Sequence, residues 1–440
     1  MSPATTAGRK RGYKAVDSIE VSLFGRPMGV VALDPAYGYY AFAYLPEFLH
    51  SGIEPAPLTM PLNGGEPYLF TDLPEATYHR LPALLGDALP DDFGNALIDR
   101  YMAEQGVERS RITALDRLAY MGQRAMGALS FKPARGPQQR SSTAIEMGAL
   151  VEQARAAVSG RIETDDYTNA ALRSIIEVGT SAGGARAKAV IAWNPRTREI
   201  RSGQVDVQEG FEHWLLKFDG LGADRELGLA QNFGRIEHAY HHMARAAGID
   251  MADCHLLEEN GRAHFMTRRF DRAAGGGRHH IQTLCAMDHI DFRKKAANAY
   301  EQLFITMQRL HLPYEQLEEA YRRMVFNVMA RNCDDHSKNF AFRLREGAAW
   351  ELAPAYDLTF AHNPQGEWTH QHLMSVNGRF RGFVEADFLA VADRFAIGTA
   401  RSVIAEVRAA VLDWPRFAAA SGVPERQAAE IGALHLPGPG

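Results

Sequence analysis

The sequence predicts an α+β protein with a small β-rich N-terminal subdomain, a mixed lobe of strands and helices, and a mainly helical C-terminal domain. Three features of the sequence support this class. Apolar residues alternate with polar ones in much of residues 16–45, as in antiparallel strands. From about Leu81 the apolar spacing becomes that of amphipathic helices. Helical patterns dominate again from Asp291, with two short strand-like interruptions.

Size and composition set the broad class of protein. The chain has 440 residues, of which 46% are apolar and 23% charged, so two or three ordinary globular domains are expected. A net charge of −5 gives no overall attraction to nucleic acid or anionic lipid. No apolar run reaches the roughly 20 residues that cross a bilayer, and the basic start lacks the apolar run of a signal peptide. We therefore expect a cytoplasmic protein without membrane contact.

The cysteines exclude two kinds of small-domain scaffold. Cys254, Cys285 and Cys333 lie far apart and show no paired spacing. This pattern indicates a reducing compartment, and it predicts neither a disulfide framework nor a zinc site.

The N-terminal subdomain is predicted over residues 1–140. Asp91 and Asp92 stand where the N-cap and the first turn of a helix belong. The polar stretch "RGPQQRSS" at 135–142 contains Pro and Gly and marks the end of the subdomain. Its elements after the first sheet are predicted as helices over 81–106 and 113–122 and a strand over 126–134.

The mixed lobe is predicted over residues 141–290, and the mainly helical C-terminal domain over residues 291–440. In the lobe, "GRIEHAYHHMARAAGI" repeats apolar residues at helical spacing, whereas "HWLLKFD" is rich in strand-forming residues. The lobe's elements are predicted as helices over 143–157, 167–177 and 234–249 and strands over 186–193, 198–205, 213–219, 254–259 and 263–271.

The stretch "VGTSAGGARAKAVIAW" at 178–193 has two interpretations. Its G-x-S-x-G pattern fits a nucleophile elbow, and Ser181 with Asp219 then resembles the dyad of patatin-like serine hydrolases. Alternatively, the glycines let backbone N–H groups cover phosphates. An elbow needs a helix directly after the serine, but the residues that follow Ser181 are typical of a strand and a turn. The hydrolase is therefore kept as the alternative to a phosphate-covering loop.

A second motif lies in "ARNCDDHSKNFAF", and a third in "WELAPAYDL". Asp334 and Asn339 are five positions apart, which is the interval of the protein-kinase catalytic loop. There the Asp accepts the proton of the substrate hydroxyl and the Asn holds magnesium. Asp357 follows at the end of a strand-like run, where a kinase places its second metal ligand.

The order of these parts along the chain is that of a kinase. A kinase needs a Gly-rich cover, a strand Lys for the phosphates, a helix Glu that pairs with it, and then the catalytic loop and the metal-binding Asp. The sequence offers these in the same order as Gly179–Lys188, Lys217, Glu237, Asp334 with Asn339, and Asp357. Five parts in the required order favour a kinase over a hydrolase.

These motifs resemble those of the HipA family, the serine/threonine kinases that act as toxins of bacterial type II toxin–antitoxin pairs. The resemblance covers nearly the whole chain and is most specific in "NCDDHSKNFAF", "WELAPAYDL", "SAGGARAKA", "WLLKF" and "RRFDR". It implies a protein-kinase-like fold, ATP and Mg²⁺ as cofactors, and a helix-turn-helix antitoxin of the HipB type as partner. DNA is then reached only through the antitoxin, and the substrate is a protein, such as an aminoacyl-tRNA synthetase.

The resemblance also implies a role for each matching residue. Asp334 is the catalytic base, Asn339 and Asp357 are the magnesium ligands, and Lys217 contacts the phosphates. Ser181 matches the serine on which such kinases phosphorylate themselves. Arg268 departs from the family, whose best-known member has an acidic residue at this first hinge position. The remaining nucleotide-site residues are the loop Gly183, Gly184, Ala185, Arg186, Ala187 and Lys188, the hinge Arg268, Arg269 and Phe270, and His336, Ser337, Lys338 and Tyr356.

Overall fold

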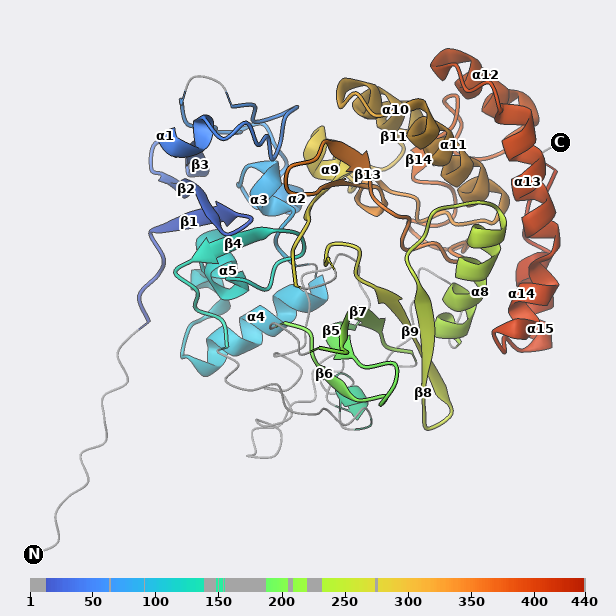
Figure 1. Cartoon of the computed structure of the whole chain (residues 1–440), viewed down its shortest axis with the longest axis horizontal. Coiled ribbons are helices and arrows are strands. Elements are labelled where there is room, and N and C mark those ends of the chain that lie inside the picture. The colour runs from blue at the N-terminus through green and yellow to red at the C-terminus, as the bar shows by residue number, and fades with distance from the viewer. Residues whose placement is uncertain are drawn as a thin grey trace, which may run out of the picture.

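The computed structural model shows a small sheet at the N-terminal end, a second sheet in the middle and a helical part at the C-terminal end (Figure 1). No helix in the part of the chain that it describes is long and apolar enough to cross a membrane. The structure describes residues 13–62, 65–90, 92–137, 148, 150–152, 154, 187–204, 209–219, 232–273 and 276–438.

The N-terminal sheet is antiparallel, with the strand order β3-β2-β1-β4. The predicted alternation is confirmed, because Ile19, Val21 and Leu23 are buried along one strand. The four strands are β1 (Ser18–Leu23), β2 (Arg26–Asp34), β3 (Tyr39–Tyr44) and β4 (Leu129–Lys132).

Short helices connect and cover this sheet. Asp92 is the first residue of α4, as predicted, whereas Asp91 lies outside the described residues. A capping box between Thr113 and Asp116 starts α5. The helices are α1 (Pro46–Leu49), α2 (Glu75–Tyr78), α3 (Ala83–Gly86), α4 (Asp92–Glu104), η1 (Arg109–Arg111) and α5 (Ala114–Met121).

The middle sheet has five antiparallel strands in the order β6-β5-β7-β9-β8. Apolar residues of β5, β7 and β9 belong to the same hydrophobic cluster as the N-terminal sheet. The predicted strands and hairpin of this region are confirmed, with small shifts at their ends. The strands are β5 (Lys188–Trp193), β6 (Ile200–Ser202), β7 (Glu212–Lys217), β8 (Cys254–Glu259) and β9 (Arg262–Arg268).

Helix α8 (Phe233–Ala246) packs between β8 and β9 on one side and the helices α13 and α14 on the other (Figure 1). It confirms the helix predicted over 234–249. Its inner face carries buried apolar residues at helical spacing, including Ile236, Tyr240 and Met243. The helices predicted over 143–157 and 167–177 fall almost entirely outside the described residues.

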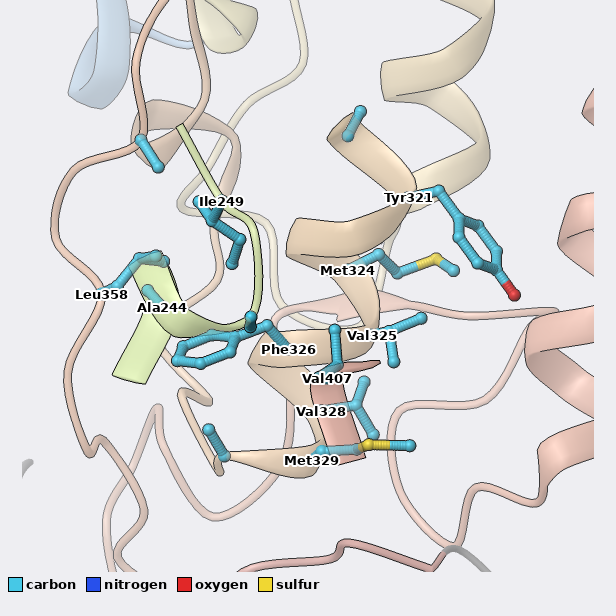
Figure 2. Packing of buried hydrophobic residues seen from close by; sticks show 14 of the residues in the cluster. Ala244, Ile249, Tyr321, Met324, Val325, Phe326, Val328, Met329, Leu358 and Val407 are labelled. Atoms are coloured by element: carbon cyan, nitrogen blue, oxygen red, sulfur yellow. The ribbon is translucent and has the colours of Figure 1, made fainter. Parts of the chain in front are cut away.

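The C-terminal part is mainly helical, as predicted, and has a large hydrophobic core. Figure 2 shows part of this core, with side chains from α8, α11 and α13. The helices are α9 (Leu284–Met287), α10 (Tyr300–Arg309), α11 (Tyr314–Met329), η2 (Ser337–Asn339), α12 (Glu385–Phe395), α13 (Ala400–Leu412), α14 (Trp414–Ala420) and α15 (Glu425–Gly432).

Short strands interrupt the helices at the places where the motifs lie. Strand β12 follows η2 and is the central strand of a three-stranded sheet, in which it pairs with β10 and β13. The sequence analysis missed β10, whose four residues are too few to show a period. The strands are β10 (His280–Thr283), β11 (Asn298–Ala299), β12 (Ala341–Leu344), β13 (Trp350–Leu352) and β14 (Met374–Ser375).

Candidate active site

Three residues predicted from separate motifs meet in one ion-paired cluster. The Nζ of Lys217, at the end of β7, lies 2.5 Å from Oε1 of Glu237 on α8. The same Nζ donates a hydrogen bond to Oδ1 of Asp357. The side chains of Glu237 and Lys217 are 2% and 10% exposed, whereas that of Asp357 is 26% exposed. One buried ammonium therefore bridges two carboxylates from different parts of the chain.

The close approach of α8 to the sheet makes this cluster possible. A Cβ atom on Gly234 would lie 2.0 Å from the carbonyl oxygen of Ala263 in β9, so only glycine fits in the first turn of α8. The buried Asp219, two residues after Lys217, accepts a hydrogen bond from the N–H of Phe233 at 3.2 Å. Its carboxylate accepts from the first N–H group of α8 and is stabilised by the positive end of the helix dipole. Strand and helix are thus tied together beside the Lys217–Glu237 pair.

The charges in the cluster stabilise one another. Burial alone would lower the pKa of Lys217, but Asp357 and Glu237 outweigh it and raise that pKa. Burial alone would raise the pKa of Asp357, yet Lys217 and Lys188 hold it below its ordinary value. Lys217 is therefore a cation and Asp357 an anion at neutral pH.

Lys188 completes this group of charges. It is the first residue of β5, it is buried, and it pairs directly with Lys217 across the β5–β7 ladder. Opposed residues of antiparallel strands project to the same face, so the two lysines flank the same space. Ala187 precedes β5 and is buried in the N-terminal cluster. Ser181 and the loop residues Gly183, Gly184, Ala185 and Arg186 lie outside the described residues.

The catalytic-loop motif forms a tight turn between α11 and β12. The Nδ2 group of Asn339 donates to the backbone oxygen of Asp334 at 2.7 Å. This hydrogen bond fixes the amide orientation and leaves the Oδ1 of Asn339 as the possible metal ligand. The Asp334 side chain is 44% exposed, with Nε2 of His336 3.8 Å from its Oδ1. A half-exposed carboxylate can reach a group that arrives from solvent.

Asn339 and Asp357 offer ligands of the kind that Mg²⁺ prefers. Both supply oxygen atoms, and Mg²⁺ is commonly held by one or two such groups together with phosphates. Asp357 has φ of 54°, a left-handed conformation that Asp tolerates better than most residues. The next residue, Leu358, is anchored in the hydrophobic core (Figure 2). The donor set therefore fits the predicted metal, with Asp357 fixed by its neighbour.

The other predicted nucleotide-site residues connect the catalytic loop with the Asp357 segment. The hydroxyl of Tyr356 donates to the backbone oxygen of Lys338 at 2.6 Å. The hydroxyl of Ser337 donates to the backbone oxygen of Ile290 at 2.6 Å, and this hydrogen bond anchors the catalytic loop to the segment that contains Ile290. The Phe270 ring centroid lies 5.8 Å from that of Tyr356, so the predicted hinge reaches the same region.

The predicted hinge is held mainly through its backbone and a buried ion pair. Arg268 is exposed, and its N–H donates to the oxygen of Asp253 at 2.8 Å. Arg269 is buried and forms two hydrogen bonds with Asp271, of 2.9 and 2.6 Å. Asp271 also accepts the N–H of Gly127 at 2.8 Å, which ties the hinge to the N-terminal subdomain. The side chains of Arg268 and Arg269 are thus engaged with protein groups.

A buried polar network beneath the catalytic loop was not predicted. Asp335 is fully buried and accepts hydrogen bonds of 2.8 Å from Tyr300, from Nδ1 of His372 and from the N–H of Leu373. Asn327 donates to the Tyr300 hydroxyl at 2.9 Å. Burial alone would lower the pKa of His372, but Cys333 and Asp335 outweigh it and raise that pKa to about 10. The only sequence signal was the second Asp of "CDD", which is four positions from Asn339 and therefore does not fit the catalytic interval that identified Asp334.

The comparisons with known proteins agree with this arrangement. The HipA-like C-terminal domain family matches residues 180–414, more than half of the chain. The chain belongs to the HipA family. The HipA N-terminal domain matches residues 19–132, which contain the N-terminal sheet except for its first residue, Ser18. No curated protein matches the sequence.

Solved structures show the HipA-type fold. HipA of Shewanella oneidensis, solved with HipB and its operator DNA, has a TM-score of 0.65 at 16% identity. The match covers 94% of this chain and 94% of that HipA. The Helicobacter pylori proinflammatory kinase CtkA matches 50% of this chain and 92% of its own, with a TM-score of 0.32 and 12% identity. The predicted α+β, HipA-type fold class is confirmed.

The family assignment counts against the serine-hydrolase alternative. The HipA-like match includes both Ser181 and Asp219. Asp219 is buried at the start of α8, where its carboxylate accepts a backbone hydrogen bond. Strand β5 begins at Lys188, only seven positions after Ser181. These observations favour a HipA-type protein over a patatin-like one.

Proposed function

We propose that this HipA-family protein is an ATP- and Mg²⁺-dependent protein serine/threonine kinase that acts as the toxin of a type II toxin–antitoxin pair. The observation that carries the proposal is the bridge from Lys217 to both Glu237 and Asp357. An active kinase needs its strand Lys paired with its helix Glu and its metal-binding Asp in place. The pairing of Lys217 with Glu237 and the position of Asp357 beside them support this proposal.

Each residue has a distinct role in this proposal. When bound, ATP supplies the phosphoryl group and Mg²⁺ offsets its charge. Lys217 binds phosphate oxygens, and Asn339 and Asp357 hold the metal. The Asp334 carboxylate would orient the hydroxyl of the protein substrate and accept its proton, while the γ-phosphoryl group passes from ATP to that oxygen and ADP leaves. His336, Ser337, Lys338, Tyr356 and the hinge Arg268–Phe270 line the nucleotide.

The proposed partners follow from the family and from charge. HipA of Shewanella oneidensis was solved with HipB and operator DNA. We propose a helix-turn-helix antitoxin of the HipB type for this chain, with DNA bound only through that antitoxin. The net charge of −5 supports this, because nonspecific DNA binding depends on Lys and Arg neutralising phosphates. The proposed substrate is a translation component in the cytoplasm, such as an aminoacyl-tRNA synthetase.

Asp357→Ala is expected to weaken Mg-ATP binding at least tenfold and to abolish phosphotransfer. The substitution removes a metal ligand and one of the two anions that pair with Lys217. Calorimetric titration with ATP in the presence and absence of Mg²⁺ measures the effect. The wild type should require Mg²⁺ for tight binding, whereas the variant should bind equally weakly in both conditions.

Asp393→Ala is the matched control, because Asp393 is exposed on α12 and outside the site. It should bind Mg-ATP as the wild type does. A wild-type chain that binds no ATP with Mg²⁺ present would overturn the proposed function.

Ser181→Ala is expected to remove self-phosphorylation while transfer to an external protein continues. In this proposal Ser181 is neither base nor metal ligand, but an acceptor in the Gly-rich loop. A phosphate there adds about −1.5 to −2 charges beside the ATP phosphates, so Ser181→Asp should bind ATP poorly. Mass spectrometry after incubation with Mg-ATP locates the phosphate. Ester hydrolysis that disappears in Ser181→Ala would instead establish the hydrolase alternative.

A further inference from the structure

A cluster of nitrogen and sulfur ligands joins helix α8 to the neighbouring strand β8. It consists of His238 and His242 on α8 and Cys254 at the start of β8. Their ligand atoms all lie within 4.8 Å of one another, and it is the one such group of three among the residues that the structure describes. No zinc site was predicted from the sequence, because the three cysteines show no paired spacing.

We propose that His238, His242 and Cys254 form a binding site for a tetrahedral divalent metal ion of the Zn²⁺ type. Zn²⁺ prefers imidazole and thiolate ligands, often three from the protein with water as the fourth. Positions i and i+4 lie one above the other on a helix, so both imidazoles face the same side. Cys254 comes from a different element. Its thiolate and the two imidazoles form a ligand set that suits Zn²⁺ but not hard ions such as Mg²⁺.

The distance between the two imidazoles matches this coordination. Nε2 of His238 lies 3.3 Å from Nε2 of His242. With Zn–N bonds of about 2.0–2.1 Å, two ligands at a tetrahedral angle are separated by about 3.3–3.4 Å. A nitrogen and a sulfur around the same ion are separated by about 3.6 Å, given a Zn–S bond of about 2.3 Å. The Sγ of Cys254 already lies within 4.8 Å of a ring nitrogen of each histidine.

A hydrogen bond to the second ring nitrogen of His238 orients its imidazole as a metal ligand. Its other ring nitrogen, Nδ1, lies 2.9 Å from the hydroxyl of Ser421, which follows α14. Metal-binding histidines almost always use the second nitrogen in this way, because the hydrogen bond fixes the ring and its tautomer. His242 is exposed, whereas His238 and Cys254 are half-buried. A metal ion can therefore enter from solvent and displace one proton from the Cys254 thiol as the M–S bond forms.

The bound ion would connect three parts of the protein. Two ligands belong to α8, one to the edge strand β8, and Ser421 links the site to the C-terminal helices. His238 is the neighbour of Glu237, which pairs with Lys217 on the other side of the helix. The metal would thus fix α8 against the edge of the sheet, and its binding does not depend on the proposed kinase activity.

Co²⁺ titration of the full chain tests the site. Tetrahedral Co²⁺ gives strong visible absorption, and a thiolate ligand adds a charge-transfer band in the near ultraviolet. The titration is made in the Asp357→Ala background, which removes the oxygen-ligand site. We expect one equivalent of Co²⁺ to give both signals, and one equivalent of Zn²⁺ to displace it and to raise the melting temperature.

Variants assign the ligands. Cys254→Ser should lose the charge-transfer band even though Cys285 and Cys333 remain, and His242→Ala should lose the tetrahedral spectrum. Ser421→Ala should retain the spectrum but bind about tenfold more weakly or worse. His50→Ala, at an exposed histidine whose Nδ1 lies 2.8 Å from the backbone oxygen of Pro46, is the matched control and should bind as the parent does.

The site would be refuted by a Co²⁺ spectrum without tetrahedral intensity, or by tetrahedral binding that the Cys254 and His242 variants leave unchanged. In the first case the two imidazoles form only a hydrogen bond with each other. In the second case the metal is held elsewhere on the chain.

Discussion

Asp334→Asn is expected to lower the rate of phosphotransfer by about 10²- to 10⁴-fold while ATP binding and folding stay unchanged. The substitution keeps the shape of the side chain but removes the acceptor for the hydroxyl proton. The Asp334 side chain is 44% exposed, so its charge contributes little to stability. Its backbone oxygen, which accepts from Asn339, is not altered, and the turn is retained.

The measurement separates catalysis from binding. Transfer of labelled phosphate to a protein substrate or to Ser181 gives the rate, nucleotide titration gives the affinity, and thermal unfolding gives the stability. The expected pattern is a large loss of rate with unchanged affinity and melting temperature. If the variant transfers phosphate at nearly the wild-type rate, Asp334 is not the base and the proton must go to another group.

Asp335→Asn is expected to lower the free energy of unfolding by about 3–5 kcal/mol. Asp335 and His372 are both fully buried, and their hydrogen bond is 2.8 Å long. Because the pKa of His372 is raised to about 10, the imidazole is charged at neutral pH and would lose the carboxylate that is hydrogen-bonded to it. The same substitution weakens the acceptor for Tyr300 and for the N–H of Leu373. The loop that carries Asp334 is then no longer anchored.

Denaturant unfolding of the neighbouring variants tests this directly. Asp334→Asn serves as the matched control, since the same chemical change one position earlier should not affect stability. The double variant Asp335→Asn with His372→Gln should recover part of the loss, because no unpaired charge remains. Equal stability of the Asp335→Asn and Asp334→Asn variants would show that the buried pair does not hold the loop.

Several sequence predictions were confirmed because they depend on local patterns. The alternation of apolar and polar residues predicted the N-terminal strands, and apolar residues at helical spacing predicted α8 and the C-terminal helices. The family could also be predicted, since its motifs are short and contiguous in sequence. The domain boundaries near residues 140 and 290 stay predictions, as do the role of Ser181 and of the loop from Gly183 to Arg186. Strand β10 was missed because a four-residue strand has no measurable period.

The sequence by itself determined the order of the site's parts, from the Gly-rich loop through Lys217 and Glu237 to Asp357. It did so because each part consists of a few adjacent residues. Their types and spacing indicate their chemistry, and no information from the rest of the chain is needed. Only the tertiary structure decided which charges meet, since Lys217 and Asp357 are 140 positions apart. It also decided that Asp334 is half-exposed while Asp335 is buried against His372. Burial and charge pairing depend on which distant segments pack together, and no local pattern records them.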